Sequence, residues 1–408
     1  MPLMRSAKNM TSHYQVIRNV RPLGAAAVDL VLERDRIHAV LAAGSADQAL
    51  PCLIDGQGQM VLPALVESHV HLDKTLWRMP WRPNSAGPTR DDRIRNEQQV
   101  LPTLDVSMAQ RAGPLIEHCI GRGSLYFRSH VDVQTCFGRQ HIEAMLAVRE
   151  KYRHVIDLQL VAFPQGGMLV APGTLQLMRE ALEMGVDVVG GIDPAAIDRD
   201  PIRHLEAIFS LAQEFDRGVD IHLHDPGDLG RWEIERIADF TQASGREGRV
   251  IISHAYALGA FPQSALEPLA DRLAALGISI MTCAPAHVTV PPVAMLRNRG
   301  VNVCSGSDGI RDTWSPMGNG DMLERAWLLA QRYGWSKDAD LDAAFDIVSQ
   351  GGARALRIQR YGLGVGDAAN LVLLPAESLA AAVVERCPQR TVISRGAIVA
   401  RDGIFLAS

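Results

Sequence analysis

The chain has 408 residues, 47% of them hydrophobic and 21% charged, with a formal net charge of −5. This is the composition of an ordinary soluble globular protein, and the length suits one large barrel or two domains. The acidic balance offers no basic face for nucleic acid or anionic membranes. The first residues hold no apolar signal region, and no run approaches the roughly 18 apolar residues of a transmembrane helix. We therefore expect a cytoplasmic protein that binds neither nucleic acid nor membrane.

Short strands and turns are predicted at both ends of the chain, over residues 14–57 and 363–408. The simplest assembly brings the two ends together as one small β-sandwich domain. We expect its two parts at residues 1–62 and 361–408, with residues 63–360 forming the second domain.

Eight β-branched runs lie between the ends, and each is followed by a longer helical pattern. From the second run onward they start about 22 to 32 residues apart, the size of a βα unit. The stretches 202–215 and 231–244 show the three- and four-residue apolar spacing of helices. An α/β fold with a closed (β/α)8 TIM barrel is favoured over an open doubly wound sheet, since no glycine-rich phosphate loop follows the first strand. The eight runs are 58–73, 124–133, 154–165, 186–194, 218–226, 248–255, 277–285 and 300–308.

The connection after the first barrel strand, residues 75–105, is unusually long, polar and rich in proline. Loops of this length at the C-terminal rim of a barrel are often lids. The alternative is a surface excursion that contacts another subunit. We expect a homo-oligomer, and the two interpretations stay open.

Six of the thirteen histidines fall at the C-terminal ends of predicted strands. Because the active sites of (β/α)8 barrels gather at that rim, these side chains are expected to converge. Residues i and i+2 of a strand point to the same face, so two His-x-His pairs aim into the barrel mouth. One such pair is more often chance than a metal site, but two pairs with a strand-8 aspartate favour a metal site. These residues are His69, His71, His130, His222, His224, His254 and Asp308.

A ligand set of His69, His71, His222 and Asp308 offers three imidazoles and one carboxylate. That set suits one divalent ion, with Zn2+ as first choice and Fe2+ as second. Such an ion lowers the pKa of a bound water and so supplies a hydroxide nucleophile near neutral pH. Asp308 can take the proton of that water and pass it to the leaving group. Two-metal barrel hydrolases commonly use a bridging lysine on a middle strand; this chain has four lysines, and none ends strand 3 or 4, so a single ion is expected.

With these residues in place, the sequence resembles the amidohydrolase superfamily, and within it the cytosine deaminase branch, over nearly the whole chain. The motifs that carry the resemblance are ESHVHLDKT (67–75), RSHVDVQT (128–135), DLQLVAFPQ (157–165), ISHA (252–255) and GVNVCSGSDGIRDTWSPMGNGDML (300–323). The resemblance implies a single metal ion held by the four residues named above and a composite β-sandwich from both ends. It also implies that His254 hydrogen-bonds the attacking water or the developing oxyanion, that Gln165 reads an amide-like edge of the ring, and that Trp314 packs beside it.

The sequence departs from the cytosine deaminases at two positions. Those enzymes carry H-x-x-E on strand 5, where this chain reads HLHDP, with Asp225 in the place of the glutamate and His224 before it. They also carry a second aspartate after the metal aspartate, where this chain has Gly309. The strand-5 H-x-H, with HLDKT and GGIDP, is more similar to the N-isopropylammelide isopropylamidohydrolases, s-triazine enzymes of the same branch. That similarity implies acid–base work by His224 and substrate contacts from Lys74 and Asp193.

Several of these residues also have a simpler structural interpretation. Lys74 could only pair with Asp73 or another carboxylate at the rim, and Trp314 could be a core aromatic. Asp193 and Asp225 could each cap the helix that follows, or Asp225 could orient a ligand by a hydrogen bond. Two histidines are expected to be structural, one lining the barrel and one in an exposed loop: His130 and His287.

Together with the ligand set, the resemblance implies attack of the hydroxide on the sp2 carbon of an N-heterocyclic amine, such as a pyrimidine, an s-triazine or a related cyclic amidine. His254 would stabilise the tetrahedral species, and Asp308, helped by His224 or Asp225, would move the proton to departing ammonia or amine. One alternative is a cyclic amide or imide hydrolase of the dihydroorotase or hydantoinase kind. Another, from a different class, is a non-catalytic metal-binding barrel that binds a heterocycle.

Overall fold

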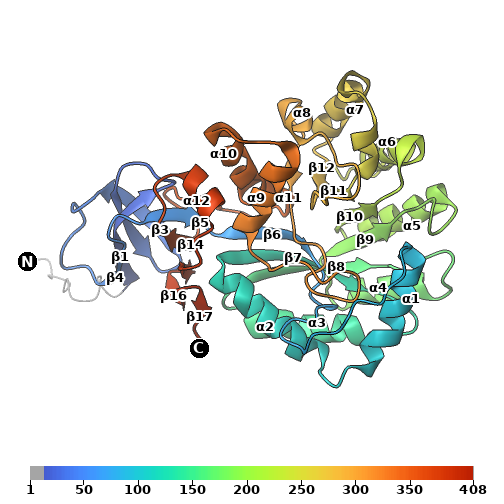
Figure 1. Cartoon of the computed structure of the whole chain (residues 1–408), viewed down its shortest axis with the longest axis horizontal. Coiled ribbons are helices and arrows are strands. Elements are labelled where there is room, and N and C mark those ends of the chain that lie inside the picture. Colours follow the sequence, from blue (N-terminus) through green and yellow to red (C-terminus); the bar gives the residue numbers. More distant parts are fainter. Residues whose placement is uncertain (1–12, 408) are drawn as a thin grey trace, which may run out of the picture.

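The computed structural model of the protein describes residues 13–407 and contains a barrel of eight parallel strands (Figure 1). The strands are β6 (Leu65–Val70), β7 (Ser124–Asp132), β8 (Asp157–Phe163), β9 (Val188–Ile192), β10 (Gly218–Leu223), β11 (Val250–His254), β12 (Ser279–Met281) and β13 (Val303–Cys304). They hydrogen-bond in sequence order, and a parallel bridge between Val70 and Asp308 links the last strand to the first. The amide of Asp308 donates to the carbonyl of His69 at 2.9 Å. The predicted (β/α)8 barrel is confirmed.

Helices follow the barrel strands and cover the outside of the sheet. They are α2 (Met108–Gly121), α3 (Gln140–Tyr152), α4 (Thr174–Glu183), α5 (Pro201–Glu214), α6 (Gly227–Ala243), α7 (Gln263–Ala275), α8 (Val293–Asn298), α9 (Met322–Tyr333), α10 (Asp338–Ile347) and α11 (Gln350–Ala355). The predicted helix over 202–215 is α5, which begins where Asp200 accepts a hydrogen bond from the amide of Arg203 and Pro201 takes the first helical position. The helix predicted over 231–244 begins earlier than expected, at Gly227.

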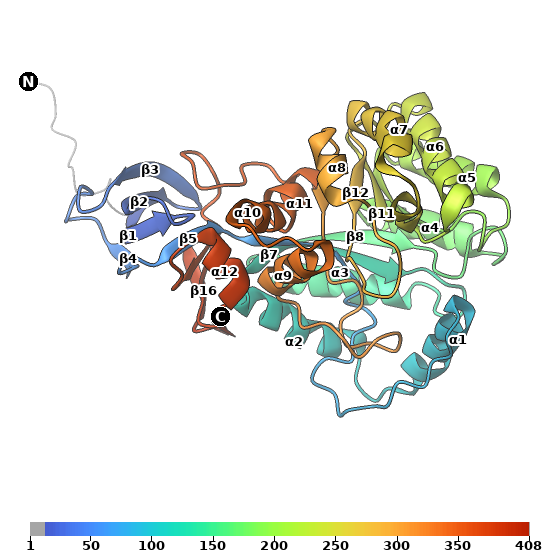
Figure 2. The ribbon, with the colours of Figure 1, turned by 45° about the horizontal axis from the view of Figure 1, so that its top comes forward.

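Both ends of the chain join in one extra sheet, as expected. Its strands are β1 (Tyr14–Pro22), β2 (Val28–Glu33), β3 (Arg36–Ala42), β4 (Cys52–Asp55), β5 (Met60–Pro63), β14 (Leu371–Leu374), β15 (Thr391–Ser394), β16 (Ala397–Arg401) and β17 (Ile404–Phe405). β5 holds the halves together, because it runs parallel to β1 on one side and antiparallel to β14 on the other. Figures 1 and 2 show these strands side by side at one end of the molecule. α12 (Leu379–Glu385) lies near them and packs against α9 and α10.

The first predicted run, 58–73, holds two strands that serve different sheets. β5 pairs in the extra sheet, and β6 begins only two residues later in the barrel. Ala64 lies between them and donates its amide to the carbonyl of Asn370 at 2.9 Å. Treating the run as one strand was therefore wrong, because a continuous apolar pattern does not show where the hydrogen-bonding partner changes. The domain limits at 62 and 360 stay predictions.

A buried ion pair connects the C-terminal segment to the barrel. The side chain of Arg390 is 0% exposed, and its two terminal nitrogens each donate to a carboxylate oxygen of Asp321 at 2.8 Å. Asp321 also caps α9 by accepting from the amide of Leu323 at 3.0 Å. The pair therefore fixes the last strands to a helix of the barrel wall.

Replacing Arg390 by leucine is expected to lower the free energy of unfolding by about 3–5 kcal/mol, because it leaves a buried carboxylate without its partner. Lysine should not rescue the protein, since one ammonium cannot make the two parallel bonds. The measurement is equilibrium unfolding in urea, with Arg401→Ala at an exposed strand end as the control. A loss no larger than that of the control would contradict the structural role.

No helix within residues 13–407 is long and apolar enough to cross a membrane.

Candidate metal centre and active site

The four predicted metal ligands lie together at the C-terminal rim of the barrel. His69 is in β6 and His71 directly after it, His222 is in β10, and Asp308 follows β13. One ligand atom from each lies within 4.8 Å of the others. Asp308 Oδ1 is 3.3 Å from His71 Nε2 and 3.7 Å from His69 Nε2, and the Nε2 atoms of His71 and His222 are 3.4 Å apart.

The chemistry of this group fits a divalent ion. His69 Nε2 is buried and has no hydrogen-bond partner in the protein, which is unusual for a buried polar atom. Burial, then the charge of neighbouring histidines, lowers the pKa of both His69 and His222 well below the usual value. The lowered pKa favours the neutral form of these two imidazoles, which is the form that binds a metal. Asp308 keeps 36% of its side chain exposed, so the carboxylate faces the open side of the group.

A hydrogen-bond chain behind His69 sets which ring nitrogen faces the ligand group. Ser253 Oγ donates to Asp220 Oδ1 at 2.7 Å, so its oxygen is left to accept from His69 Nδ1 at 3.1 Å. Arg128 holds the other oxygen of Asp220 at 3.0 Å. With its proton on Nδ1, His69 presents the lone pair of Nε2 to the metal position. This hydrogen-bond chain was not predicted from the sequence, although Asp220 lies two residues before His222 and hence on the same strand face.

Ser253→Ala is expected to weaken metal binding by about 10- to 100-fold, because His69 loses the partner that fixes its tautomer. The measurement is competition for zinc against a chromophoric chelator. The matched control is Ser394→Ala, which removes another buried hydroxyl that bonds only a backbone carbonyl, that of Val155. Equal zinc affinity of the two variants would show that the chain does not tune the site.

Three further predicted residues lie beside the ligands, at the ends of β9, β10 and β11. The rings of His254 and His224 stack with centroids 4.3 Å apart and planes 23° apart. Asp193 accepts from the backbone amide of His224 at 2.6 Å and contacts His224 Nδ1 at 2.9 Å. Burial, then the charge of His224, lowers the pKa of His254 to about 3, so its ring is neutral. Asp193 thus holds the orientation of His224 from a neighbouring strand end.

The other three predicted substrate-binding residues, Lys74, Gln165 and Trp314, meet around one unexpected carboxylate. Lys74 Nζ lies 2.8 Å from Asp132 Oδ1, contacts Gln165 Oε1, and sits 5.5 Å from the ring centre of Trp314. Glu97 accepts from Gln165 Nε2 at 2.7 Å and from Trp314 Nε1 at 2.8 Å. Burial alone would lower the pKa of Lys74, but the carboxylates around it, Asp132 first, raise the pKa above its usual value. Lys74 is therefore charged and does pair with rim carboxylates.

Asp225 lies behind the rim, among different neighbours. Its carboxylate accepts from the amide of Ala196 at 3.1 Å, while Glu233 accepts from the amide of Ala195 at 2.8 Å. Burial, then the charge of Asp225, raises the pKa of Glu233 to about 8. These contacts place Asp225 under the loop that carries Asp193. This position agrees with the interpretation of Asp225 as a residue that supports its neighbours by a hydrogen bond. Acid–base work by Asp225 stays a prediction.

The positions of the two remaining histidines match their structural interpretation. The ring of His130 is buried in the barrel with its centroid 4.0 Å from that of His69. His287 is exposed in the loop after β12.

The absence of a side chain at Gly309 has a physical reason. A Cβ atom there would lie 2.1 Å from Asp312 Oδ2. The other oxygen of Asp312 accepts from the amides of Trp314 and Ser315, both at 2.8 Å. The carboxylate of Asp312 therefore fills the space that a second aspartate at position 309 would need.

Two more groups at the rim went unnoticed in the sequence. Cys283 Sγ is 3.8 Å from both Asp308 Oδ2 and His254 Nδ1, and the hydroxyl of Tyr256 is 3.4 Å from that same nitrogen. Burial, then the charge of Asp308, raises the pKa of Cys283 to about 12, so the group is a neutral thiol. Cys283 lies near the C-terminal end of the predicted run 277–285 and two residues after β12, and this position could have marked it.

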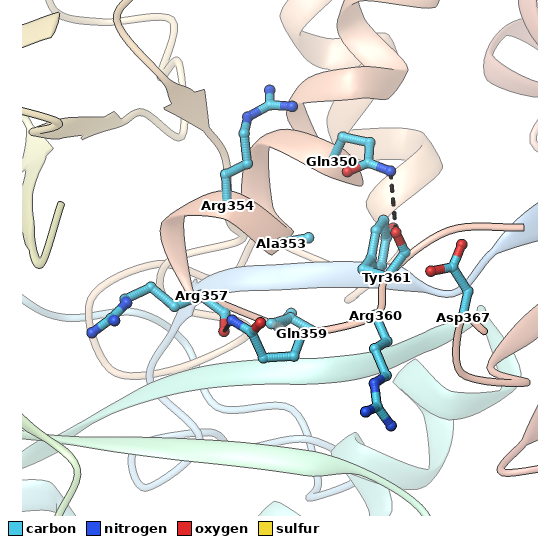
Figure 3. Close-up of a pocket in the computed structure, with 9 residues that line it drawn as sticks. Gln350, Ala353, Arg354, Arg357, Gln359, Arg360, Tyr361 and Asp367 are labelled. Carbon is cyan, nitrogen blue, oxygen red and sulfur yellow. Dashed lines mark hydrogen bonds between the residues drawn. The ribbon is translucent and has the colours of Figure 1, made fainter. Parts of the chain in front are cut away.

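An open pocket of about 440 Å3 lies elsewhere, around the segment after α11 (Figure 3). Tyr361 in its wall donates to the carbonyl of Ala64 at 2.6 Å, which places the pocket at the N-terminal ends of the barrel strands. Its arginines, Arg354, Arg357 and Arg360, point in different directions in Figure 3. None of the predicted site residues lines the pocket, and it is not the candidate active site.

The fold and the rim site together define a metal-dependent hydrolase of the (β/α)8 class. The sequence profile described as the amidohydrolase family matches residues 127–400. The chain belongs to the amidohydrolase family, whose members hydrolyse carbon–nitrogen bonds. The resemblance seen in the sequence motifs is confirmed.

Relatives with solved structures cover almost all of the chain. The N-isopropylammelide isopropylaminohydrolase of Burkholderia multivorans is 42% identical, with a TM-score of 0.92 over 96% of this chain and 100% of that one. The 5-methylcytosine deaminase of Klebsiella pneumoniae, liganded with 5-fluorocytosine, is 31% identical, with a TM-score of 0.84 over 97% of this chain and 99% of that one. The N-isopropylammelide isopropyl amidohydrolase of Pseudomonas sp. (strain ADP) is 34% identical over 87% of this chain and 89% of its own length.

Proposed function

We propose that the protein hydrolyses an exocyclic carbon–nitrogen bond of an N-heterocyclic amine, with an amino- or alkylamino-substituted s-triazine as the first substrate class to test. The observation that carries the proposal is the cluster of Lys74, Gln165 and Trp314, which lies at the same end of the barrel strands as the His/Asp ligand group. The names of the relatives at 42% and 34% identity support the s-triazine class, and that of the relative at 31% identity supports a pyrimidine as the second class.

The metal that we infer is a single Zn2+ ion, with Fe2+ as second choice, held by His69, His71, His222 and Asp308. When bound, such an ion acts as a Lewis acid and makes water nucleophilic near neutral pH. We also infer that the protein forms a homo-oligomer and that the two chain ends form a domain separate from the barrel.

Proton movement is assigned to side chains whose geometry allows it. Asp308 Oδ1 faces the histidine ligands, while Oδ2 lies on the side of Cys283 and is left to take the proton of the attacking water. His254 Nε2 is buried without a partner in the protein, so it is placed to hydrogen-bond the developing oxyanion. His224, oriented by Asp193, delivers a proton to the departing nitrogen.

Ring recognition is assigned to the groups around Lys74. Beyond its bonds to Glu97 and Lys74, the amide of Gln165 has one more N–H hydrogen and one more oxygen lone pair, which match an N–C=O edge as in an oxo-triazine. The charged Lys74 stabilises negative charge on such a ring, and Trp314 supplies a flat apolar wall. This set fits a polar, planar ring with few apolar substituents.

The test is a metal-replete activity screen on cytosine, isocytosine, creatinine, ammelide and N-alkylamino triazines, with release of ammonia or amine as the readout. Turnover is expected to be fastest on an amino- or alkylamino-triazine. Hydrolysis of dihydroorotate or hydantoin in place of these rings would show a cyclic amide hydrolase. Tight binding of one ring without turnover would show a non-catalytic binding barrel.

A further inference from the structure

We propose that Glu97 of α1 (Arg90–Val100) is a positioning residue that assembles the ring-recognising wall when this helix docks on the barrel rim. The inference rests on the proposed function, because it concerns the groups assigned to ring binding. It gives the long segment 75–105 a defined task, that of a lid which completes the site.

The contacts of Glu97 carry the proposal. Its side chain is 0% exposed, and each of its oxygens holds a different group of the wall. Oε1 accepts from Gln165 Nε2 at 2.7 Å, and Oε2 accepts from Trp314 Nε1 at 2.8 Å. Oε2 also lies 3.4 Å from Lys74 Nζ. One carboxylate therefore fixes three side chains that come from three different loops of the rim.

The spacing along α1 directs a polar face into the site. Arg90, Ile94 and Glu97 are four and three residues apart, so they share one face of the helix. Arg90 pairs with Asp193 Oδ2 at 2.5 Å and so reaches the residue that orients His224. Ile94 and Glu97 are the buried residues of the helix. Since α1 buries only one apolar side chain, its docking depends mainly on these polar contacts.

The position of α1 agrees with a lid. In Figure 2 the helix stands apart from the other labelled helices, at the lower right. Two neighbours of Glu97 make further bonds to the rim: Asn96 donates to the carbonyl of Thr313 at 3.3 Å, and Gln98 donates to Gln134 at 2.6 Å. A helix held by few buried apolar contacts can leave its site at a low free-energy cost.

The buried carboxyl group of Glu97 has a cationic neighbour, Lys74, and an acidic neighbour, Asp132. Burial raises the pKa of Glu97 well above its usual value; Lys74 opposes this effect, and Asp132 adds to it. The carboxyl groups of Glu97 and Asp132 thus share the buried ammonium group of Lys74. Glutamine at position 97 keeps the size of the side chain and one accepting oxygen, so it should preserve part of the contacts that hold the wall. Alanine removes all of these contacts.

The experiment compares Glu97→Ala and Glu97→Gln with Gln99→Ala, an exposed position on the same helix. For the ring that the screen identifies, kcat/KM is expected to fall about 10- to 100-fold in Glu97→Ala, mainly through KM, because the hydrogen bonds that hold Gln165 and Trp314 in place are lost. The kcat/KM of Glu97→Gln should lie between those of Glu97→Ala and the wild type. Gln99→Ala should match the wild type, and all variants should bind zinc in the same amount.

Limited trypsin digestion measures how readily α1 opens, and its first comparison needs no ring compound. Cleavage after Arg93 and Arg95 requires α1 to open, so it should be faster in Glu97→Ala than in the wild type or Gln99→Ala. Ammelide or its hydrolysis product cyanuric acid should slow the cleavage in the wild type but not in Glu97→Ala.

Three results would overturn the proposal. A higher kcat/KM or tighter ring binding in Glu97→Ala would mean that Glu97 blocks the site. Values equal to those of Gln99→Ala would mean that Glu97 is a bystander. If the wild type binds none of the rings, the proposed function fails, and unchanged trypsin cleavage in Glu97→Ala then excludes the docking role of Glu97 as well.

Discussion

Asp308→Asn is expected to lower kcat by about 100- to 10,000-fold at saturating zinc, the usual contribution of a positioned general base. Asp308 is the one carboxylate in the four-residue ligand group, and its second oxygen lies 3.8 Å from Cys283 Sγ. An asparagine oxygen can still contact an ion, but the amide cannot take a proton. Release of amine or ammonia from the best ring substrate measures the loss.

The control for Asp308→Asn has to separate a lost base from a lost ligand. Zinc per chain is measured in the same preparation by elemental analysis, and activity is compared at equal occupancy. Asp228→Asn, an exposed position at the start of α6, should retain wild-type turnover. More than about one tenth of the wild-type rate in fully loaded Asp308→Asn would exclude Asp308 as the proton shuttle, since a base contributes at least about 100-fold.

The barrel and its ligand group could be predicted because both depend on local patterns that topology makes converge. The crossover connections of βα units are almost always right-handed, and in a closed barrel the C-terminal ends of the parallel strands meet at one rim. His69, His71 and His222 lie in strands or directly after them, where alternation fixes the direction of the side chain. For these residues the two-residue alternation of the strand was enough to predict that the side chains point into the barrel mouth.

At and beyond the last residue of a strand, the alternation of side chains no longer fixes where a side chain points. His254, Asp308 and Asp193 have φ values of 72°, 62° and 30°, in the left-handed region that residues other than glycine rarely adopt. Their side chains are aimed by the turns that they occupy and no longer by the pleat of the strand. Asp225 has the spacing of a family glutamate, yet its carboxylate turns to the amide of Ala196.

Glu97 could not be placed from the sequence at all. It belongs to a connection whose ends are anchored at β6 and α2, and no hydrophobic period fixes where the residues between them dock. Its partners, Gln165 and Trp314, are 68 and 217 residues away along the chain. A capping box at Thr89 and Asp92 marks where α1 begins, but it carries no information about what the helix covers.

Removal of the metal with a chelator is expected to abolish turnover and to lower stability, because the ion binds the folded ligand group and not the unfolded chain. At a free zinc concentration 100 times the dissociation constant, binding contributes about 2.7 kcal/mol to the free energy of unfolding. The melting temperature should therefore fall on chelation and rise again with added zinc. Asp308→Asn should show a smaller shift, since one of its four ligands is altered.

The number of ions needed for recovery tests the ligand assignment. One equivalent of Zn2+ should restore full turnover to the stripped protein, because the four rim residues form one group and the lysine that would bridge a second ion is missing from strands 3 and 4. Fe2+ added under anaerobic conditions gives the comparison between the two metals. A requirement for two equivalents would replace the single-ion site by a two-metal site, in which a further group at the rim, such as His254 with Cys283, would have to bind the second ion.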